Sequence, residues 1–232
     1  MASYTTAPSA PAPSSAQAQT AFNPKAVFWD RIARKYASDP IADMAGYEAT
    51  LRRVRTWLSV DQDVLEIGCG TGTTALQLAP STRSLLATDF SADMIAIARE
   101  KLAHQSVRGL SFAVADADTP TFAQGAYHAV LAFNLLHLVS DLDRTLSLAI
   151  QALKPGGLLI TKTPCVKEMN PLIPHLALPL MRAMGKAPHV LCFKGDELQS
   201  AITRQGMAVV SVERHGTRRK DIRAFIVARK PL

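Results

Sequence analysis

Three glycines at alternating positions are the feature that most constrains how this 232-residue chain can fold. Gly68, Gly70 and Gly72 follow a short apolar run that predicts a strand over 62–67, and they lead into a helical pattern over 72–79. Glycine permits the positive φ angles of a sharp turn, and without a Cβ atom it lets a ligand lie against bare main chain. The pattern therefore predicts a strand, a tight ligand-binding loop and a helix.

Strand and helix signals then alternate along the chain. Apolar runs predict four more strands, at 84–88, 110–115, 128–133 and 158–162. Helices are expected at 91–104, with Ser91 as its N-cap and Met94, Ile95, Ala98 and Leu102 on its buried side, at 141–153 and at 194–205. Two β-like runs at 207–213 and 222–228 predict an antiparallel pair around a polar turn. This alternation favours an α/β fold with a parallel sheet covered on both faces.

The remaining segments predict one domain over 23–232, preceded by a disordered tail at 1–22 that is rich in Ala, Ser and Pro. Two helices over 23–58 carry apolar stripes typical of core packing, although the aromatic residues Trp29 and Tyr36 could instead close over a ligand. Residues 164–192 contain five prolines among leucines, isoleucine and methionines, which predicts a lid inserted after the fifth strand.

The charge distribution and the cysteine content limit the classes of function that the chain could have. The net charge of +7 is concentrated in residues 211–230, where a solvated turn is a simpler interpretation than a nucleic-acid patch. The three cysteines lack the spacing of a disulfide framework or zinc site, so no metal is expected. No apolar run is long enough to span a bilayer, and no secretory or mitochondrial leader pattern is present. We expect a cytoplasmic protein, either monomeric or homodimeric, and peripheral membrane contact stays open.

Glu66 distinguishes between the ligands that such a glycine loop could hold. Gly70, Gly72 and Ala75 fit the G-x-G-x-x-A variant of dinucleotide-binding loops, and Asp89 suits a carboxylate that accepts ribose hydroxyl hydrogen bonds. A carboxylate at Glu66, however, would repel a pyrophosphate and favour a ligand that carries ammonium and sulfonium groups. The residues thus favour adenosylmethionine over NAD.

Five motifs in order over residues 25–163 resemble the class I S-adenosylmethionine-dependent methyltransferases, especially the ubiquinone and menaquinone C-methyltransferases. The motifs are Val64-Leu65-Glu66-Ile67-Gly68-Cys69-Gly70-Thr71-Gly72, Thr88-Asp89-Phe90-Ser91-Ala92-Asp93-Met94, Ala115-Asp116-Ala117-Asp118, Asn134-Leu135-Leu136-His137-Leu138 and Leu153-Lys154-Pro155-Gly156-Gly157. The resemblance implies a Rossmann-like, doubly wound sheet of seven strands whose last strand is antiparallel.

The resemblance also implies roles by position. The loop from Glu66 to Gly72 would hold the methionine part of adenosylmethionine and Asp89 the ribose, with Phe90 in the same motif. The residues expected around the adenine and the sulfonium are Met94 near the adenine, Asp116 at its exocyclic amine, Ala117 as a backbone donor and Asn134 beside the sulfonium. Turn or capping chemistry is the alternative for Asp116 and Asn134, and core packing for Met94.

For catalysis, His137 is a candidate general base and Tyr36 a candidate for shaping the pocket, while a packed histidine is the alternative at His137. Methyl transfer is an in-line displacement that needs alignment more than a base. The apolar lid predicts a small, apolar or lipid-like acceptor, and the alternative is a lid that packs only on its own domain or on a second subunit. Three other functions stay open: an RNA methyltransferase, an NAD-dependent oxidoreductase, and a non-catalytic adenosylmethionine-binding partner protein.

Overall fold

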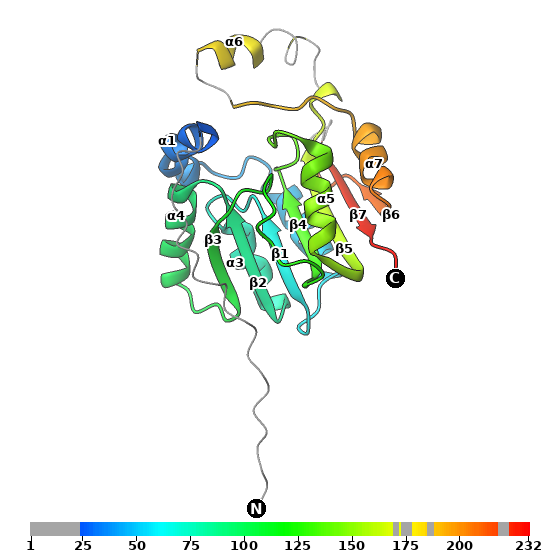
Figure 1. Ribbon diagram of the computed structural model, residues 1–232. Coiled ribbons are helices and arrows are strands. Elements are labelled where there is room, and N and C mark those ends of the chain that lie inside the picture. The colour runs from blue at the N-terminus through cyan, green and yellow to red at the C-terminus, as the bar shows by residue number, and fades with distance from the viewer. Residues whose placement is uncertain (1–23, 169–171, 173–177, 185–187, 218–222) are drawn as a thin grey trace, which may run out of the picture.

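The computed structural model describes residues 24–168, 172, 178–184, 188–217 and 223–232, which form a seven-stranded sheet between helices (Figure 1). The strand order is β3-β2-β1-β4-β5-β7-β6. Strands β1 to β5 pair in parallel, and β7 lies antiparallel between β5 and β6. The strands are β1 Asp63–Ile67, β2 Ser84–Asp89, β3 Leu110–Val114, β4 Tyr127–Phe133, β5 Leu153–Pro164, β6 Ala208–Glu213 and β7 Arg223–Arg229. The predicted α/β class, the number of strands and the antiparallel last strand are confirmed.

The helices follow the predicted order with shorter bounds. They are α1 Pro24–Ser38, α2 Met44–Arg55, α3 Thr73–Leu78, α4 Ala92–Ala103, α5 Leu142–Ala152, α6 Leu178–Ala183 and α7 Gly195–Arg204, with 3-10 turns η1 Ala79–Ser81 and η2 Val166–Glu168. The start of β5 differs from the prediction. The sequence predicts that a helix ends at residue 153 and that the strand begins at residue 158, whereas β5 begins at Leu153 and includes the residues between them. Tyr127 pairs with Leu153 before a register shift, so the turn residues lie within the strand as an irregularity.

The core consists of two layers, because successive residues of each strand point to opposite faces of the sheet. On one face, Leu65 and Val130 pack with α5 and α7. On the other face, Val64 and Ile160 pack with α2, α3 and α4. Both faces are buried, which explains why the strands read as continuous apolar runs rather than as alternating ones.

Short polar side chains begin the helices at the carboxyl ends of the strands. The Ser91 hydroxyl accepts a hydrogen bond from the Met94 amide at the start of α4, as the sequence predicts, and Asp141 does the same for α5 through the Arg144 amide. Gly72 begins α3 with φ of +74°. These starts place the N-termini of α3 and α4 beside the ends of β1 and β2.

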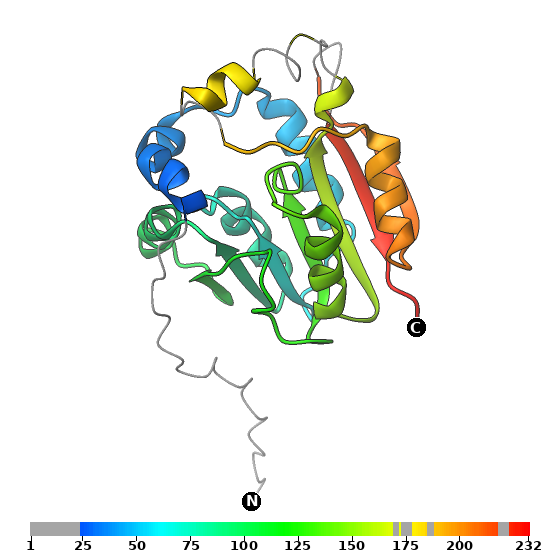
Figure 2. The same ribbon diagram turned by 45° about the horizontal axis from the view of Figure 1, so that its top comes forward.

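The N-terminal helices and the lid differ in part from expectation. Helix α2 spans 44–55 rather than running to residue 58, and Met44 at its start is 49% exposed, so it lies outside the core stripe. The predicted tail at 1–22 lies outside the described residues, as does much of the 164–192 segment. Helix α6 is described, and both ribbon views place it at the same end of the molecule as α1 (Figures 1 and 2).

Among the described residues, no helix combines the length and the apolar character that crossing a membrane requires.

Candidate functional site

A cavity lies at the carboxyl ends of β1, β2 and β4, where the sequence predicts a ligand. We call it the first cavity. It is lined by Trp29, Tyr36, Glu66, Gly68, Cys69, Gly70, Thr74, Asp89, Phe90, Met94, Phe133, Asn134, Leu135 and Leu138. The structure thus brings together nine of the predicted site residues: Tyr36, Glu66, Gly68, Cys69, Gly70, Asp89, Phe90, Met94 and Asn134.

Glu66 is the most unusual polar residue of the first cavity. Its side chain is buried, with 2% exposure, and its Oε2 atom has no hydrogen-bond partner among the described residues. A buried acceptor without a donor is unfavourable unless a ligand supplies one. An ammonium group is such a donor, so this orphaned oxygen fits the amino group of adenosylmethionine.

The ionisation of Glu66 corrects the charge argument made from the sequence. Burial, followed by repulsion from Asp89, raises the pKa of Glu66 to about 8, so the carboxyl is largely protonated at pH 7 in the protein alone. A cation placed beside it would favour the ionised form, whereas a phosphate would disfavour that form further. The Glu66 site therefore still favours a cationic ligand over a phosphate. The carboxyl, however, would become ionised when the cation binds and is not already charged in the protein alone.

Asp89 links the glycine loop to the start of α4. Its Oδ2 atom accepts a hydrogen bond from the Gly70 amide at 2.9 Å, and its Oδ1 atom accepts one from the Ser91 amide at 2.9 Å. Burial raises the pKa of Asp89, while these two backbone hydrogen bonds oppose that rise. The carboxyl group is therefore fixed in orientation at the cavity wall, where ribose hydroxyls could donate to its remaining lone pairs.

The glycine loop has the open backbone that a close ligand needs. Gly70 has φ of +54°, and a Cβ atom there would meet only Tyr36 Cε1, at 3.8 Å, on the cavity side. At Gly68, with φ of +67°, a Cβ atom would lie 2.5 Å from Leu135 Cδ1. Gly68 is thus required by packing, whereas the absence of a side chain at Gly70 leaves space within the cavity.

Two aromatic residues of α1 cover the loop. Trp29 and Tyr36 lie in an edge-to-face arrangement with ring centroids 6.3 Å apart, and both line the first cavity. The interpretation of this stripe as core is wrong for Tyr36, which is 49% exposed, because α1 lies over the cavity mouth rather than over the sheet. Partial desolvation by the residues around the phenol, and then the nearby Asp89 carboxylate, raise the pKa of Tyr36, so the phenol stays protonated near neutral pH.

Four predicted site residues do not line the first cavity: Gly72, Asp116, Ala117 and His137. Gly72 begins α3, and the Asp116 Oδ1 atom accepts a hydrogen bond from the Asp118 amide, which is the turn chemistry weighed as its alternative. Ala117 is buried in the α5-side core. Their roles toward the adenine stay predictions.

His137 is packed rather than directed into the first cavity. Its Nδ1 atom is buried with no hydrogen-bond partner among the described residues, and its carbonyl accepts a hydrogen bond from the Leu191 amide at 2.7 Å. Burial lowers the pKa of His137 to about 4, which keeps the ring neutral at pH 7. The neutral ring could accept a proton, but its role as a base stays a prediction.

A second cavity adjoins the first on the α2 side of β4 and β5. It shares Thr74, Phe133 and Asn134 with the first cavity, so these residues form a common wall. Its other lining residues are Ile41, Ala42, Asp43, Tyr47, Thr50, Leu51, Val54, Lys162 and Arg223. The wall residue Asn134 adopts φ of +52°, a conformation that Asn tolerates better than most residues.

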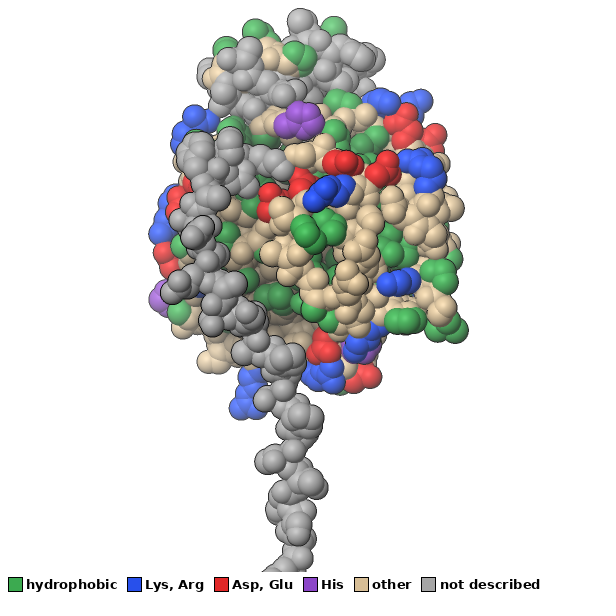
Figure 3. All heavy atoms as spheres, in the orientation of Figure 1, with side chains coloured by type: hydrophobic (Ala, Val, Ile, Leu, Met, Phe, Trp, Pro, Cys, Tyr) green, Lys and Arg blue, Asp and Glu red, His purple; other side chains and the backbone are tan. Residues whose placement is uncertain are grey.

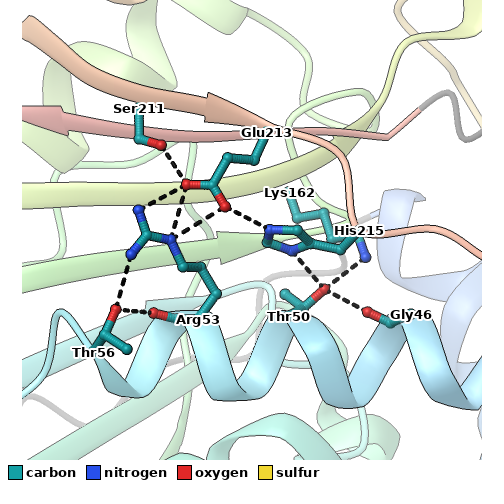
Figure 4. Close-up of polar contacts among 8 residues, drawn as sticks. All are labelled: Gly46, Thr50, Arg53, Thr56, Lys162, Ser211, Glu213 and His215. Atoms are coloured by element: carbon teal, nitrogen blue, oxygen red, sulfur yellow. Dashed lines mark hydrogen bonds and ion pairs between the residues drawn. The ribbon is translucent and has the colours of Figure 1, made fainter.

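Lys162 of β5 lies in the wall of the second cavity with 8% exposure. Lys162 and Ile160 are two residues apart in the strand, so both side chains point to the α2 face of the sheet. The Lys162 Nζ atom donates a hydrogen bond to Thr50 Oγ1 at 2.7 Å (Figure 4). The sequence pattern predicts Lys162 only as the last residue of a strand. The signal that could have singled it out is a lysine in the otherwise uncharged run Leu158 to Pro164, since lysine is rarely fully buried without a partner.

Basic residues of the described part of the C-terminal segment form ion pairs and hydrogen bonds with other residues of the chain. Arg214 pairs with Glu168 at 2.9 Å, and the Lys230 ammonium donates to the carbonyls of Ile150 and Leu153 at the end of α5. On the face shown in Figure 3, basic and acidic side chains are intermingled. These contacts agree with the simpler interpretation of this segment.

Comparison with known proteins identifies the central part of the chain. Residues 64–157 match the family model described as "Methyltransferase domain". This range includes the glycine loop, Asp89 and Asn134, and it ends within β5.

Sequence relatives share this part of the chain. The ubiquinone/menaquinone biosynthesis C-methyltransferase UbiE of Geotalea daltonii is 31% identical over 102 residues, which are 42% of this chain and 43% of UbiE. The iterative polyketide synthase afoE of Emericella nidulans is 35% identical over 126 residues, 50% of this chain and 4% of that protein. The chain thus spans less than half the length of these relatives.

Solved structures share the fold over more of the chain. Phosphoethanolamine N-methyltransferase 2 of Haemonchus contortus, in complex with S-adenosyl-L-methionine, covers 91% of this chain with a TM-score of 0.74 and 17% identity, over 61% of its own length. The CurJ carbon methyltransferase covers 75% of this chain and 50% of its own, with a TM-score of 0.59 and 23% identity.

Proposed function

We propose that residues 64–157, which match the methyltransferase domain model, form a class I S-adenosylmethionine-dependent methyltransferase domain, and that the protein transfers a methyl group from this cofactor to a small acceptor with an apolar body. The observation that carries the proposal is the buried Glu66 Oε2 atom, which has no partner among the described residues and faces the cavity beside a bare glycine loop. An ammonium group of a bound ligand would satisfy it.

Different residues of the first cavity would bind different parts of adenosylmethionine. Glu66 would accept hydrogen bonds from the amino group, Asp89 would accept them from the ribose, and the main chain at Gly70 would lie against the ligand. Tyr36 and Trp29 would exclude water from above. Adenosylmethionine supplies an activated methyl group on a sulfonium, so the protein mainly has to align an acceptor with it.

An apolar acceptor body is supported by the second cavity and by α6. The second cavity presents Ile41, Leu51, Val54 and Phe133. Leu180 of α6 and Met184 just after it are more than half exposed, and α6 lies at the same end of the molecule as α1. The names of two similar proteins, UbiE and CurJ, specify carbon methyltransferases, which supports carbon as the methylated atom.

The proposal is tested first by ligand binding. Isothermal calorimetry of the full chain should show binding of adenosylmethionine and adenosylhomocysteine, with NAD binding at least about 100-fold weaker if two or more hydrogen bonds to charged groups are lost. Tight NAD binding with indifference to adenosylmethionine would support the oxidoreductase alternative and contradict the proposal.

Turnover is tested separately with methyl-labelled adenosylmethionine and a panel of phenols, 1,3-dicarbonyls, amines and RNA. Label transfer to small molecules is the expected result. Transfer to RNA, together with a salt-dependent gel shift, would support the nucleic-acid alternative. Cofactor binding with no transfer across the panel would support the non-catalytic partner protein.

A further inference from the structure

Building on the proposed function, on which the inference rests, we propose that the second cavity binds the methyl acceptor as an uncharged molecule whose carbonyl oxygen accepts a hydrogen bond from the Tyr47 phenol. The cavity adjoins the first along Thr74, Phe133 and Asn134, so a molecule bound there lies next to the expected position of the methyl donor. A shared wall is the arrangement that an in-line transfer between two ligands needs.

The Tyr47 hydroxyl lies where the two cavities meet. The side chain extends from α2, lines the second cavity and packs in part against the core on that face of the sheet. Its oxygen atom lies 3.4 Å from Oγ1 of Thr74, and Thr74 lines both cavities. A ligand that extends from the second cavity toward the methyl donor would therefore pass within reach of this hydroxyl.

The contact between the Tyr47 and Thr74 hydroxyls leaves hydrogen-bonding capacity unused. Well-formed O–H···O hydrogen bonds have oxygen–oxygen distances of about 2.5–3.0 Å, so a contact at 3.4 Å is a weak one. Within the described part of the chain, neither hydroxyl has another hydrogen-bond partner. Each hydroxyl carries one proton, and their mutual contact uses only one of the two. At least one donor remains, and a carbonyl oxygen, which has two lone pairs and no proton, suits it.

The Tyr47 phenol keeps its proton at neutral pH and is therefore a donor. Burial is the main cause that raises the pKa of Tyr47, the hydrogen bond with Thr74 lowers it, and the Glu66 carboxylate raises it again. Since Glu66 lines the first cavity, its effect on the phenol agrees with a Tyr47 hydroxyl near the boundary between the cavities.

The charged side chains of the second cavity already have partners, which favours an uncharged ligand. Asp43 accepts hydrogen bonds from the Thr217 hydroxyl at 2.6 Å, from the Thr217 amide at 2.9 Å and from the Gly46 amide at 3.0 Å. These hydrogen bonds, and then the positive charge of Lys162, lower the pKa of Asp43 to about 2. Lys162 and Arg223 both have further interactions. The loss of hydration of a charged ligand would therefore be poorly offset in this cavity.

The apolar side chains of the same lining would set the orientation of the acceptor. Leu51 and Val54 come from α2, and Phe133 comes from the end of β4 at the shared wall. Pockets commonly orient a small ligand with a few well-placed polar groups among apolar walls. An acceptor with an apolar body and a carbonyl group would lie with its body against these side chains and its oxygen toward Tyr47.

The test compares matched ketones and alkenes on the full chain saturated with adenosylhomocysteine. The probes are phenyl alkyl ketones with alkyl chains of increasing length, each paired with the alkene in which a CH2 group replaces the carbonyl oxygen and with a carboxylate of similar size. Binding is measured by calorimetry and by ligand-observed NMR. We expect the ketones to bind more tightly than the carboxylates, and the carbonyl stretch of a 13C-labelled ketone to show a hydrogen bond in the bound state.

Tyr47→Phe should weaken ketone binding about 2- to 10-fold and leave alkene binding unchanged, because only the ketone loses a hydrogen bond. The carbonyl stretch should then shift toward its value in a hydrocarbon solvent. Tyr127→Phe is the matched control, because it removes the hydroxyl of a half-buried tyrosine at the opposite end of β4, and it should change neither result.

Thermal melting checks that each variant is folded, and the comparison of ketone with carboxylate in the unchanged protein does not depend on any variant. The proposal would be overturned by an equal effect of Tyr47→Phe on ketone and alkene, by tighter binding of the carboxylates, or by no binding of any ketone in the series.

Adenosylhomocysteine binding separates this proposal from the proposed function. If the ketones fail to bind while adenosylhomocysteine still binds, the methyltransferase assignment stands and only the assigned class of acceptor is wrong. If adenosylhomocysteine itself does not bind, the proposed function is wrong.

Discussion

The two adjoining cavities differ in how the chain builds them. The first is formed mainly by short loops that directly follow β1, β2 and β4, and Glu66, Gly70 and Asp89 come from two consecutive motifs. The second draws on residues from 41 to 223, with α2, β5 and β7 contributing one or a few side chains each. Short sequence motifs can thus specify the residues of the first cavity, whereas those of the second come together only through tertiary packing.

The largest effect is expected from changing the carboxyl group of Glu66 in the first cavity. Glu66→Gln keeps the size of the side chain but cannot become negatively charged, so a hydrogen bond to a ligand ammonium would lose the charge of its acceptor. We expect adenosylmethionine to bind about 10- to 100-fold more weakly in calorimetry. Unchanged affinity in a folded Glu66→Gln protein would show that this carboxyl does not contact the ammonium.

Gly70→Ala tests the bare backbone of the first cavity. Ala at φ of +54° costs about 1 kcal/mol of stability, and its Cβ atom would project into the cavity, so adenosylmethionine binding should fall by roughly tenfold. The matched control is Gly125→Ala, which has φ of +60° and no atom within 4 Å of the added Cβ. Calorimetry and urea unfolding should show similar stability losses in both variants but weaker binding only in Gly70→Ala. Equal affinities would place the ligand away from the loop.

Thr50→Val sharpens the account of the second cavity. It removes the acceptor of Lys162 Nζ and of His215 while keeping the shape of the buried side chain. We expect a stability loss of about 1–3 kcal/mol in urea unfolding, because Lys162 loses a buried hydrogen-bond acceptor. Thr56→Val, at the C-cap of α2, is the control, because Thr56 is exposed and, among the described residues, its hydroxyl bonds only with Arg53. An equal loss in both variants would show that the buried Thr50 hydroxyl contributes no more stability than the exposed one.

The smallest expected effect is the pH dependence of stability. Between its ordinary value of 4.5 and about 8, the Glu66 carboxyl is ionised in the unfolded chain but protonated in the folded one, because burial raises its folded pKa. Raising the pH through this window therefore favours unfolding. Urea unfolding at pH 5 and pH 8 should show a smaller loss of stability for Glu66→Gln than for the unchanged protein.

Adenosylmethionine should reverse the sign of this effect on binding. Because the ligand favours the ionised carboxyl, its affinity should rise between pH 6 and pH 8, with proton release seen as a dependence of the calorimetric heat on the buffer. In Glu66→Gln the affinity should be flat over this range. A flat profile in the unchanged protein would mean that Glu66 does not contact the ammonium.

The contrast also explains what could be predicted from the sequence. Strand periodicity, the Ser91 cap and the glycine loop gave the sheet and most of the first cavity, since each depends on residues that are neighbours in the chain. The sequence leaves open whether Tyr36 lies in the core or over the cavity and whether His137 is packed, and it does not predict the burial of Lys162, because each of these depends on how distant segments meet. The raised pKa of Glu66 likewise results from the layers packed around it rather than from the motif.

The position of β7 between β5 and β6 carries a consequence for the order of assembly. Every residue that lines the first cavity precedes residue 139, so a growing polypeptide contains all its groups well before synthesis reaches β7. The second cavity needs Arg223, and the support of Lys162 needs His215. During synthesis, the full set of residues that line the first cavity is therefore present before that of the second.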